Sequence, residues 1–247
     1  MDTLRLFFQE RLAEIDAYLD LLSGLEAQIQ EGPPRLGVAG PTVTTTQQRI
    51  LYSSVYLQLY NLIEATITKC IDAVCSAISQ DDRWHPRDLS QDLKREWVRY
   101  IARTHVELNY ENRLIHSLEL CEHLLRTLPI SDIKIERGGG GNWDDEEIYR
   151  FATRLGCALA ISKESNEAIK RPFKNDLGAL ALIVKLRNDL AHGSISFVEC
   201  GDEVTAGELK ELKSKTARYL EEVVRSFSDF IVSHAFLAPD RRPPAAA

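Results

Sequence analysis

A short run near the end of the chain, Arg187 to Gly193, gathers the side chains of this sequence that are best suited to chemistry. It follows a nearly continuous apolar stretch and places Arg187, Asn188, Asp189 and His192 within six positions. If the run is helical, Asn188 and His192 lie one turn apart on one face, and the long Arg187 side chain reaches from a neighbouring edge. His192 falls in the last turn, where unpaired backbone carbonyls favour a cation. We therefore expect the guanidinium and the imidazole to converge on an anion near the helix end.

This combination suits the cleavage of a phosphodiester bond in RNA. A guanidinium holds a phosphate through two hydrogen bonds and stabilises the charge that develops in the transition state. An imidazole moves a proton to or from the 2′-hydroxyl or the leaving 5′-oxygen. The attacking hydroxyl belongs to the RNA, so no metal-bound water is required. One helix offers a single histidine, and two antiparallel copies across a twofold axis would offer two of each group. The ordinary alternative is a solvated helix end with a local ion pair.

Other polar residues are weaker candidates for the same site. Asn61 and Glu64 flank an apolar stripe on an earlier long segment, where such residues are usually solvated. The basic residues close to the run form either a solvated face or the rim of an RNA groove. They are Lys170, Arg171, Lys174 and Lys185.

Metal and cofactor chemistry find little support in the sequence. A group of histidines and one cysteine invites a zinc interpretation, but its spacing fits no standard zinc framework. This group is His105, His116, Cys121 and His123. The four glycines at 138–141 lack the Lys-Ser/Thr that follows a phosphate-binding loop. We expect no metal and no cofactor.

The composition favours a helical protein of the cytosol. The chain has 247 residues, 44% of them hydrophobic, which suffices for a substantial core. Its net charge of −7 argues against a general nucleic-acid coat, although a local basic patch is enough to bind one strand. Five irregularly spaced cysteines argue against a disulfide scaffold. No segment approaches the roughly 20 apolar residues that span a bilayer, and the N-terminus lacks signal-peptide features, so we expect a cytoplasmic protein.

Apolar residues at spacings of three and four predict a series of helices. We expect an N-terminal helix within residues 1–31, a helical domain at 43–237 with an insertion at about 128–171, and a disordered tail at 238–247. Residues 133–136 alternate like a short strand, the segment 163–174 is charged and poorly periodic, and Gly193 suits a left-handed helix cap. After the N-terminal helix, the predicted helices cover about 47–79, 89–104, 113–127, 142–155, 176–191 and 206–236.

The pattern Arg187-Asn188-x-x-x-His192, followed by Gly193, resembles the Arg-x4–6-His signature of HEPN domains. The string Leu59-Tyr60-Asn61-Leu62-Ile63-Glu64-Ala65 lies on the long helix that often carries a polar residue facing this motif in the superfamily. The strings Gly140-Gly141-Asn142-Trp143-Asp144 and Phe151-Ala152-Thr153-Arg154-Leu155-Gly156 resemble the MAE-type HEPN branch of bacterial defence and toxin systems. The resemblance spans about residues 47–236.

The resemblance implies an all-α HEPN-like bundle of long antiparallel helices that forms a homodimer and cuts RNA without a metal. It assigns Arg187 and His192 to the catalytic pair, with Asn188 in the polar position after the arginine and Glu64 as a supporting group. Asp189 and Asn61 are further supporting candidates because they lie beside these residues in the sequence. Such a ribonuclease would serve as a toxin or antiviral-defence effector, restrained or triggered by a cognate antitoxin or sensor protein.

Related toxins commonly carry a tyrosine two residues after the histidine, and Ser194 stands there in this chain, which puts control by tyrosine adenylylation in doubt. The main alternative is a non-catalytic HEPN module that scaffolds partners or binds a nucleotide. A DNA-binding regulator is opposed by the acidic balance and by the lack of a basic helix-turn-helix segment.

Overall fold

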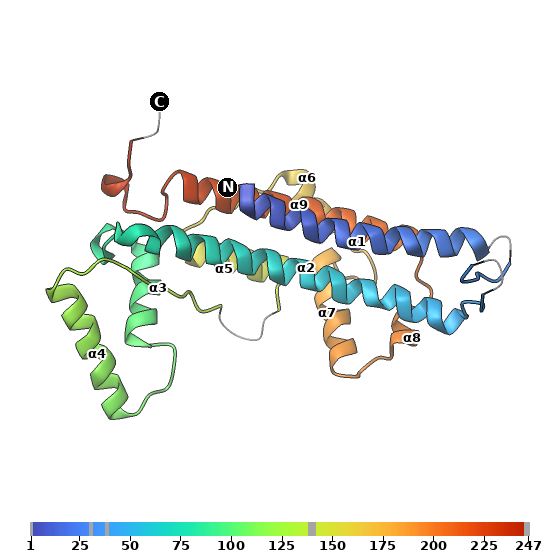
Figure 1. Cartoon of the computed structure of the whole chain (residues 1–247), viewed down its shortest axis with the longest axis horizontal. Helices are drawn as coiled ribbons and strands as arrows, with labels where there is room; N and C mark the ends of the chain where they lie inside the picture. The colour runs from blue at the N-terminus through green and yellow to red at the C-terminus, as the bar shows by residue number, and fades with distance from the viewer. Residues whose placement is uncertain (1, 30–31, 38–39, 138–141, 245–247) are drawn as a thin grey trace. The chain divides into compact units, whose positions relative to one another are not determined.

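The structure is a computed structural model that describes residues 2–29, 32–37, 40–137 and 142–244 (Figure 1). The described residues form helices joined by coil, with no strand, so the predicted all-α class is confirmed. The α-helices are α1 Asp2–Ile29, α2 Thr45–Ser79, α3 Gln91–Ala102, α4 Tyr110–Leu125, α5 Asp145–Arg154, α6 Lys163–Lys170, α7 Ala179–Ala191, α8 Phe197–Cys200 and α9 Ala206–Val232.

Contacts divide the chain into two compact units, which are described separately. The first unit comprises Met1–Thr66, Asn142–Asp145 and Ile161–Glu222. The second unit comprises Ile67–Gly141, Glu146–Ala160 and Val223–Ala247. Helices α2 and α9 contribute residues to both units. The separate N-terminal element and the insertion at about 128–171 stay predictions.

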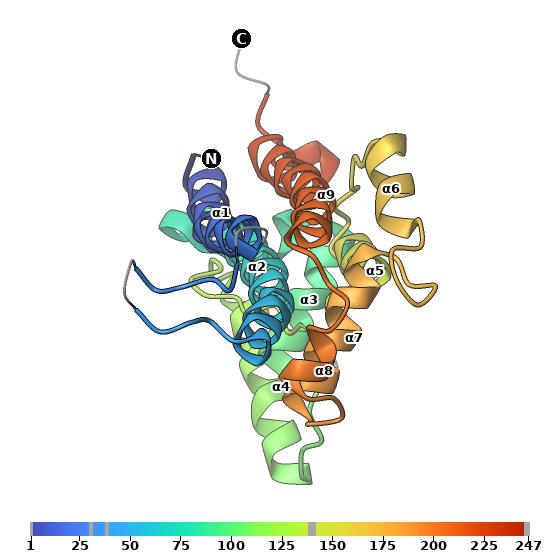
Figure 2. The same cartoon turned by 90° about the vertical axis from the view of Figure 1, so that its right-hand side faces the viewer.

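The first unit is built around the N-terminal part of α2. Thr44 and Gln47 cap this helix reciprocally, since the Thr44 hydroxyl accepts from the Gln47 amide and the Gln47 side chain accepts from the Thr44 amide. Apolar residues spaced by four along this part of α2, Val55, Leu59 and Ile63, are buried, and the tyrosines one face away, Tyr52, Tyr56 and Tyr60, are buried as well. Because α2 is apolar on several faces, it needs neighbours on several sides, and it lies between α1 and other helices of this unit (Figure 2).

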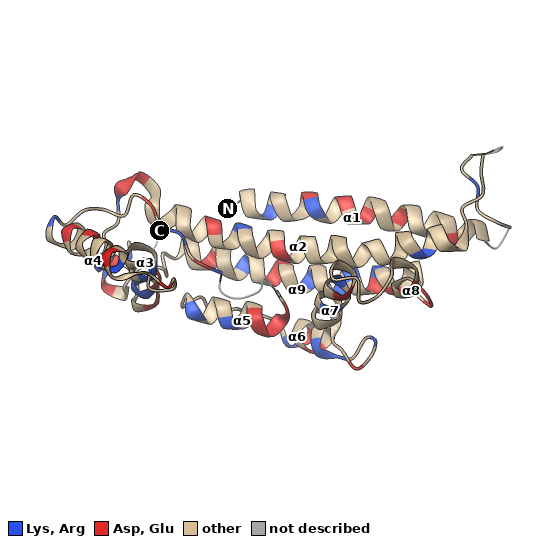
Figure 3. Ribbon diagram, turned by 90° about the horizontal axis from the view of Figure 1, so that it is seen from below, with Lys and Arg blue, Asp and Glu red and all other residues tan. Residues whose placement is uncertain are grey.

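Helix α1 is tied to the first-unit part of α9 by polar groups. Lys210 and Lys213 of α9 pair with Asp20 and Asp16 of α1 at 3.2 and 2.7 Å. The Glu26 carboxylate accepts hydrogen bonds from the Tyr52 hydroxyl and the Ala206 amide. Acidic and basic residues are interspersed along α9 (Figure 3), so its exposed side is of mixed charge.

Two segments differ from the prediction. The charged segment at 163–174 contains a helix, α6, whose start is capped by Ser162 accepting from the Ser165 amide. The predicted short strand at 133–136 is coil, although Ile133 and Ile135 are both buried as the alternation requires.

The C-terminal tail is partly ordered, contrary to the prediction. Pro239–Arg241 form a 3-10 helix where the sequence predicts a disordered tail, and Arg242 donates hydrogen bonds to the Leu237 and Ala235 carbonyls. Residues 245–247 and the glycines at 138–141 lie outside the described residues. None of the described helices has the length and apolarity needed to cross a membrane.

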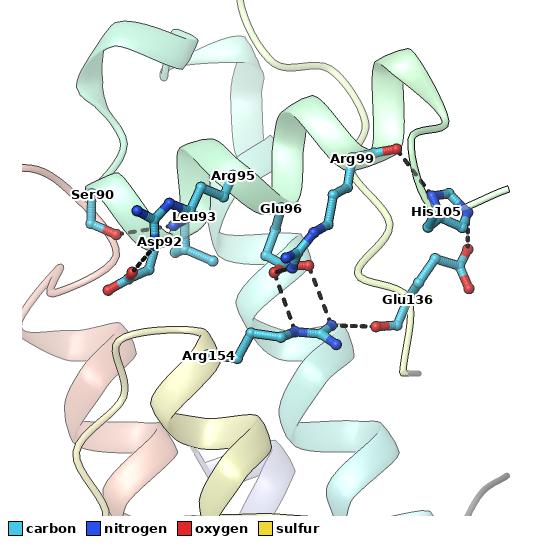
Figure 4. Close-up of polar contacts among 9 residues, drawn as sticks. All are labelled: Ser90, Asp92, Leu93, Arg95, Glu96, Arg99, His105, Glu136 and Arg154. Carbon is cyan, nitrogen blue, oxygen red and sulfur yellow. Dashed lines mark hydrogen bonds and ion pairs between the residues drawn. The ribbon is translucent and has the colours of Figure 1, made fainter. Parts of the chain in front are cut away.

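A buried carboxylate organises the second unit (Figure 4). Glu96 of α3 is only 2% exposed and pairs with Arg99 and with Arg154 of α5. The Arg154 Nε and Nη2 atoms lie 3.2 and 3.3 Å from the two oxygens of the Glu96 carboxylate. Nη2 also donates to the Glu136 carbonyl. His105 accompanies this network, with its Nδ1 atom 3.1 Å from the Arg99 carbonyl. The ion pair thus joins α3 to α5, and its arginine also binds the coil at Glu136.

Candidate functional site

Helix α7 carries the Arg187–His192 run, as the apolar pattern predicts. Its inner face buries Leu180, Ile183 and Leu190, and this burial anchors the helix in the first unit. The helix ends at Ala191 with His192 as its C-cap, and Gly193 follows with φ +69°, which confirms the predicted left-handed glycine cap. The end of the run is therefore at the surface, with the His192 side chain exposed.

The guanidinium of Arg187 is held in place by two neighbours. Its Cζ atom lies 3.6 Å from the centre of the Tyr60 ring, and its Nη1 atom donates a 2.6 Å hydrogen bond to the Asn188 side-chain oxygen. Burial raises the pKa of the Tyr60 phenol, and the positive charge of Arg187 opposes that rise. Stacking on an aromatic face orients a guanidinium while leaving its edges for other partners.

Asn188 extends this arrangement to a second segment. Its side-chain nitrogen donates to the Asn142 side-chain oxygen at 3.0 Å, so the residue bridges Arg187 and the segment that precedes α5. His192 follows Asn188 by four residues, and its backbone amide donates to the Asn188 carbonyl. The imidazole thus lies one helical turn beyond the bridge.

Asp189 has a partner other than Arg187. It forms a 2.6 Å ion pair with Lys185, four residues earlier on α7. Residues two positions apart point about 200° apart around a helix, so Asp189 and Arg187 occupy different sides of α7. Within the described part of the chain, no carboxylate forms an ion pair with Arg187. The local ion pair expected of an ordinary solvated helix end therefore involves Lys185, and no described carboxylate pairs with Arg187.

The supporting residues on α2 separate into two groups. Glu64 lies one turn after Tyr60, and its charge raises the Tyr60 pKa, so it belongs to the neighbourhood of Arg187. Asn61 is exposed and lines a groove with Arg11 and Glu14 of α1. The structure therefore places Asn61 on the α1 side of α2.

The basic candidates are spread from the end of α6 to the middle of α7. Lys185 is exposed beside the run, and Lys174 lies close enough to Cys200 to lower the pKa of that thiol, which burial raises to about 11. Lys170 and Arg171 end α6, next to Gly178 at the start of α7. Fourteen residues of helix separate Gly178 from His192, a distance of roughly 20 Å. The structure does not gather these two with the catalytic candidates.

The sequence did not identify Tyr60 and Asn142 as members of the site, although they contact Arg187 and Asn188. Both lie in strings that carried the family resemblance, yet their contacts with α7 depend on tertiary structure. The available signal was the position of Tyr60 one turn before Glu64. Among the described residues, no three His, Cys, Asp or Glu side chains gather as a metal site.

Comparison with protein families assigns the chain to one of them. The chain matches the family described as MAE_28990-like HEPN over residues 2–236. The match extends from the start of α1 to beyond the end of α9. No curated protein and no solved structure matches the chain. The chain belongs to the MAE_28990-like HEPN family, as its Arg187–His192 run and its all-α fold indicate.

Proposed function

We propose that this protein is a metal-independent endoribonuclease that acts as a homodimer. The observation that carries the proposal is the state of Arg187, an oriented guanidinium without a carboxylate partner among the described residues, five residues before an exposed imidazole on the same helix. A guanidinium placed in this way binds a phosphate at little cost, because no ion pair has to be broken.

The chemistry follows from the groups of two chains. Arg187 of each copy binds the scissile phosphate and stabilises its developing charge. One His192 accepts the proton of the 2′-hydroxyl while the 2′-oxygen attacks phosphorus. The other His192 donates a proton to the 5′-oxygen as its bond to phosphorus breaks. The products are a 2′,3′-cyclic phosphate and a free 5′-hydroxyl, and no oxidant, metal or added water takes part.

Two asparagines maintain the geometry of the Arg187 guanidinium. Asn188 fixes the guanidinium and is itself fixed by Asn142. Lys174 supplies local positive charge for the neighbouring phosphates of the strand, and Lys185 adds to it when it exchanges Asp189 for a phosphate. We place this activity in the cytoplasm, in a toxin or antiviral-defence effector whose partner is an antitoxin or sensor protein.

The test is RNA cleavage by the pure protein in EDTA. We expect internal cuts that leave cyclic phosphate ends, detected by mass spectrometry of the fragments. Cleavage that disappears in EDTA and returns with added Mg²⁺ would contradict the metal-independent mechanism. A protein that leaves RNA intact at every concentration would instead be the non-catalytic scaffold or nucleotide-binding module.

Tyr60 is expected to assist cleavage by orienting Arg187. Tyr60→Leu removes the stacking surface, which is worth about 0.5–2 kcal/mol, so the cleavage rate should fall roughly tenfold. Tyr60→Phe keeps the ring and should retain most of the activity. The matched control is Tyr56→Leu, one turn earlier on α2 and equally buried, because it removes a similar side chain away from Arg187. Equal cleavage rates for Tyr60→Leu and Tyr56→Leu would remove Tyr60 from the site.

A further inference from the structure

Helix α4 exposes its apolar side chains. The helix has sixteen residues, is capped by Asn109, and buries none of its side chains. Leu114, Leu118 and Leu125 are 43%, 59% and 84% exposed, and Cys121 between them is exposed too. These positions are four, three and four residues apart, so they form one continuous stripe along the helix.

The opposite face of α4 contacts the rest of the second unit, and it carries one leucine, Leu120, between two histidines. His123 lies against the Trp97 ring of α3 with the ring centres 5.0 Å apart, and its Nε2 atom is buried without a hydrogen-bond partner among the described residues. His116 lines a cavity of about 380 Å³ with Tyr100 and Arg103. An amphipathic helix on the surface of a monomeric protein normally turns its leucines toward the protein core. The orientation of α4 indicates that its leucine stripe has a partner.

The sequence of α4 reads nearly the same in both directions. From Arg113 to Arg126 it runs Arg-Leu-Ile-His-Ser-Leu-Glu-Leu-Cys-Glu-His-Leu-Leu-Arg, with its midpoint between Glu119 and Leu120. Each apolar residue before the midpoint has an apolar counterpart after it. The pairs are Leu114 with Leu125, Ile115 with Leu124, and Leu118 with Cys121.

We propose that α4 pairs with α4 of a second copy, antiparallel, about a twofold axis through this midpoint. A symmetric contact requires a self-complementary surface, and the palindrome supplies one. Leu118 then lies against Cys121 of the second copy, and Leu114 lies against Leu125.

Charge complements this pairing at the ends of the helix. Glu111 and Arg126 lie on the same edge of the leucine stripe, at about 100° per residue. The twofold axis places Arg126 of one copy opposite Arg113 of the other. Arg126 is then two residues, roughly 3 Å along the helix, from Glu111 of that second copy. The same attraction occurs twice because the contact is symmetric.

The area of the contact sets its expected strength. Two sixteen-residue helices bury roughly 800–1,000 Å² in total, at the low end for a specific interface. We therefore expect association that depends on protein concentration. The inference uses residues of the second unit alone, so it stands apart from the proposed ribonuclease activity.

Disulfide cross-linking between two versions of the chain tests the register. Leu118→Cys in a Cys121→Ser background is mixed with the unaltered chain under oxidised glutathione, one of the two carrying a size tag. We expect the mixed dimer to form about tenfold or more faster than with the control, because pairing raises the local thiol concentration. The control places the cysteine outside the leucine stripe and away from the register position, Arg113→Cys in the same background. A mixed-dimer rate equal to that of the control would overturn the pairing. If the unaltered chain cross-links with itself through Cys121 faster than the mixed dimer forms, the helices are either parallel or antiparallel about an axis at Cys121, and both outcomes overturn the register.

Solution mass provides the second test. Leu118→Glu places a charge in the stripe and should lower the average mass in sedimentation velocity at high concentration. The matched control is Leu21→Glu on α1, since Leu21 is similarly exposed at 53%. Circular dichroism verifies that both variants fold. If Leu118→Glu has the same mass as the unaltered chain throughout, α4 does not pair. RNA cleavage is measured on the same samples, so a failure of the proposed activity is recognised separately.

Discussion

His192→Ala is expected to lower the rate of RNA cleavage about 10²–10⁴-fold, the usual contribution of a general acid or base. The side chain is exposed at the end of α7, so its truncation leaves no cavity and the fold should persist. The rate is measured with an end-labelled RNA in EDTA, and folding by circular dichroism and thermal denaturation. Full activity in this variant would remove His192 from the mechanism.

Arg187→Ala should reduce cleavage to a similar extent, because it removes the group that stabilises the developing charge. Arg187→Lys retains the charge but loses the planar fork and the stacking on Tyr60, so it should recover little of the rate. Lys210→Ala on α9 is the matched control, since it removes a cation from an exposed ion pair elsewhere in the first unit.

Mixing the two inactive variants tests whether the site is composite. A mixed dimer of Arg187→Ala with His192→Ala still brings one guanidinium and one imidazole to the shared site, each from a different chain. We expect the mixture to cut RNA faster than either variant alone. A mixture no more active than its components, despite proven exchange of subunits, would place the chemistry within a single chain.

The part of this site that the sequence reveals is the part within one helix. Arg187, Asn188 and His192 are neighbours in sequence, so helical geometry alone relates them. The stack on Tyr60 and the bond to Asn142 join α7 to distant segments, and no local spacing encodes such contacts. The ion pair of Asp189 illustrates the same limit, because the sequence offers both Arg187 and Lys185 as partners and only the structure selects Lys185.

The fold shows a similar division between local and tertiary information. Long helices such as α2 and α9 are predictable because an apolar period repeats over many turns. Helix α6 has only Ser165 and Ile169 buried, too few positions to reveal a period. For α4 the period correctly indicates a helix, but the stripe shows only that something should cover it, and this chain leaves it exposed.

Arg154→Ala is expected to lower the free energy of unfolding by about 3 kcal/mol, near the lower end for breaking a buried ion pair. Glu96 is almost completely buried, so its carboxylate has no access to water once the two nitrogens of Arg154 are removed. Arg99 remains beside it and limits the loss. In a chain of this length the change corresponds to a fall of roughly 6–12 °C in Tm, which differential scanning calorimetry measures.

The control for this variant lies on the same helix. Arg150 of α5 is 75% exposed and pairs with Glu147, three residues earlier, so Arg150→Ala should change stability by no more than about 0.5 kcal/mol. The variant Glu96→Gln with Arg154→Met keeps the volume but removes both charges of the pair. It should be more stable than Arg154→Ala alone, because no unpaired carboxylate is left in the interior. If Arg154→Ala and Arg150→Ala unfold at the same temperature, the pair with Glu96 does not hold α3 and α5 together, and packing of their apolar residues alone must do so.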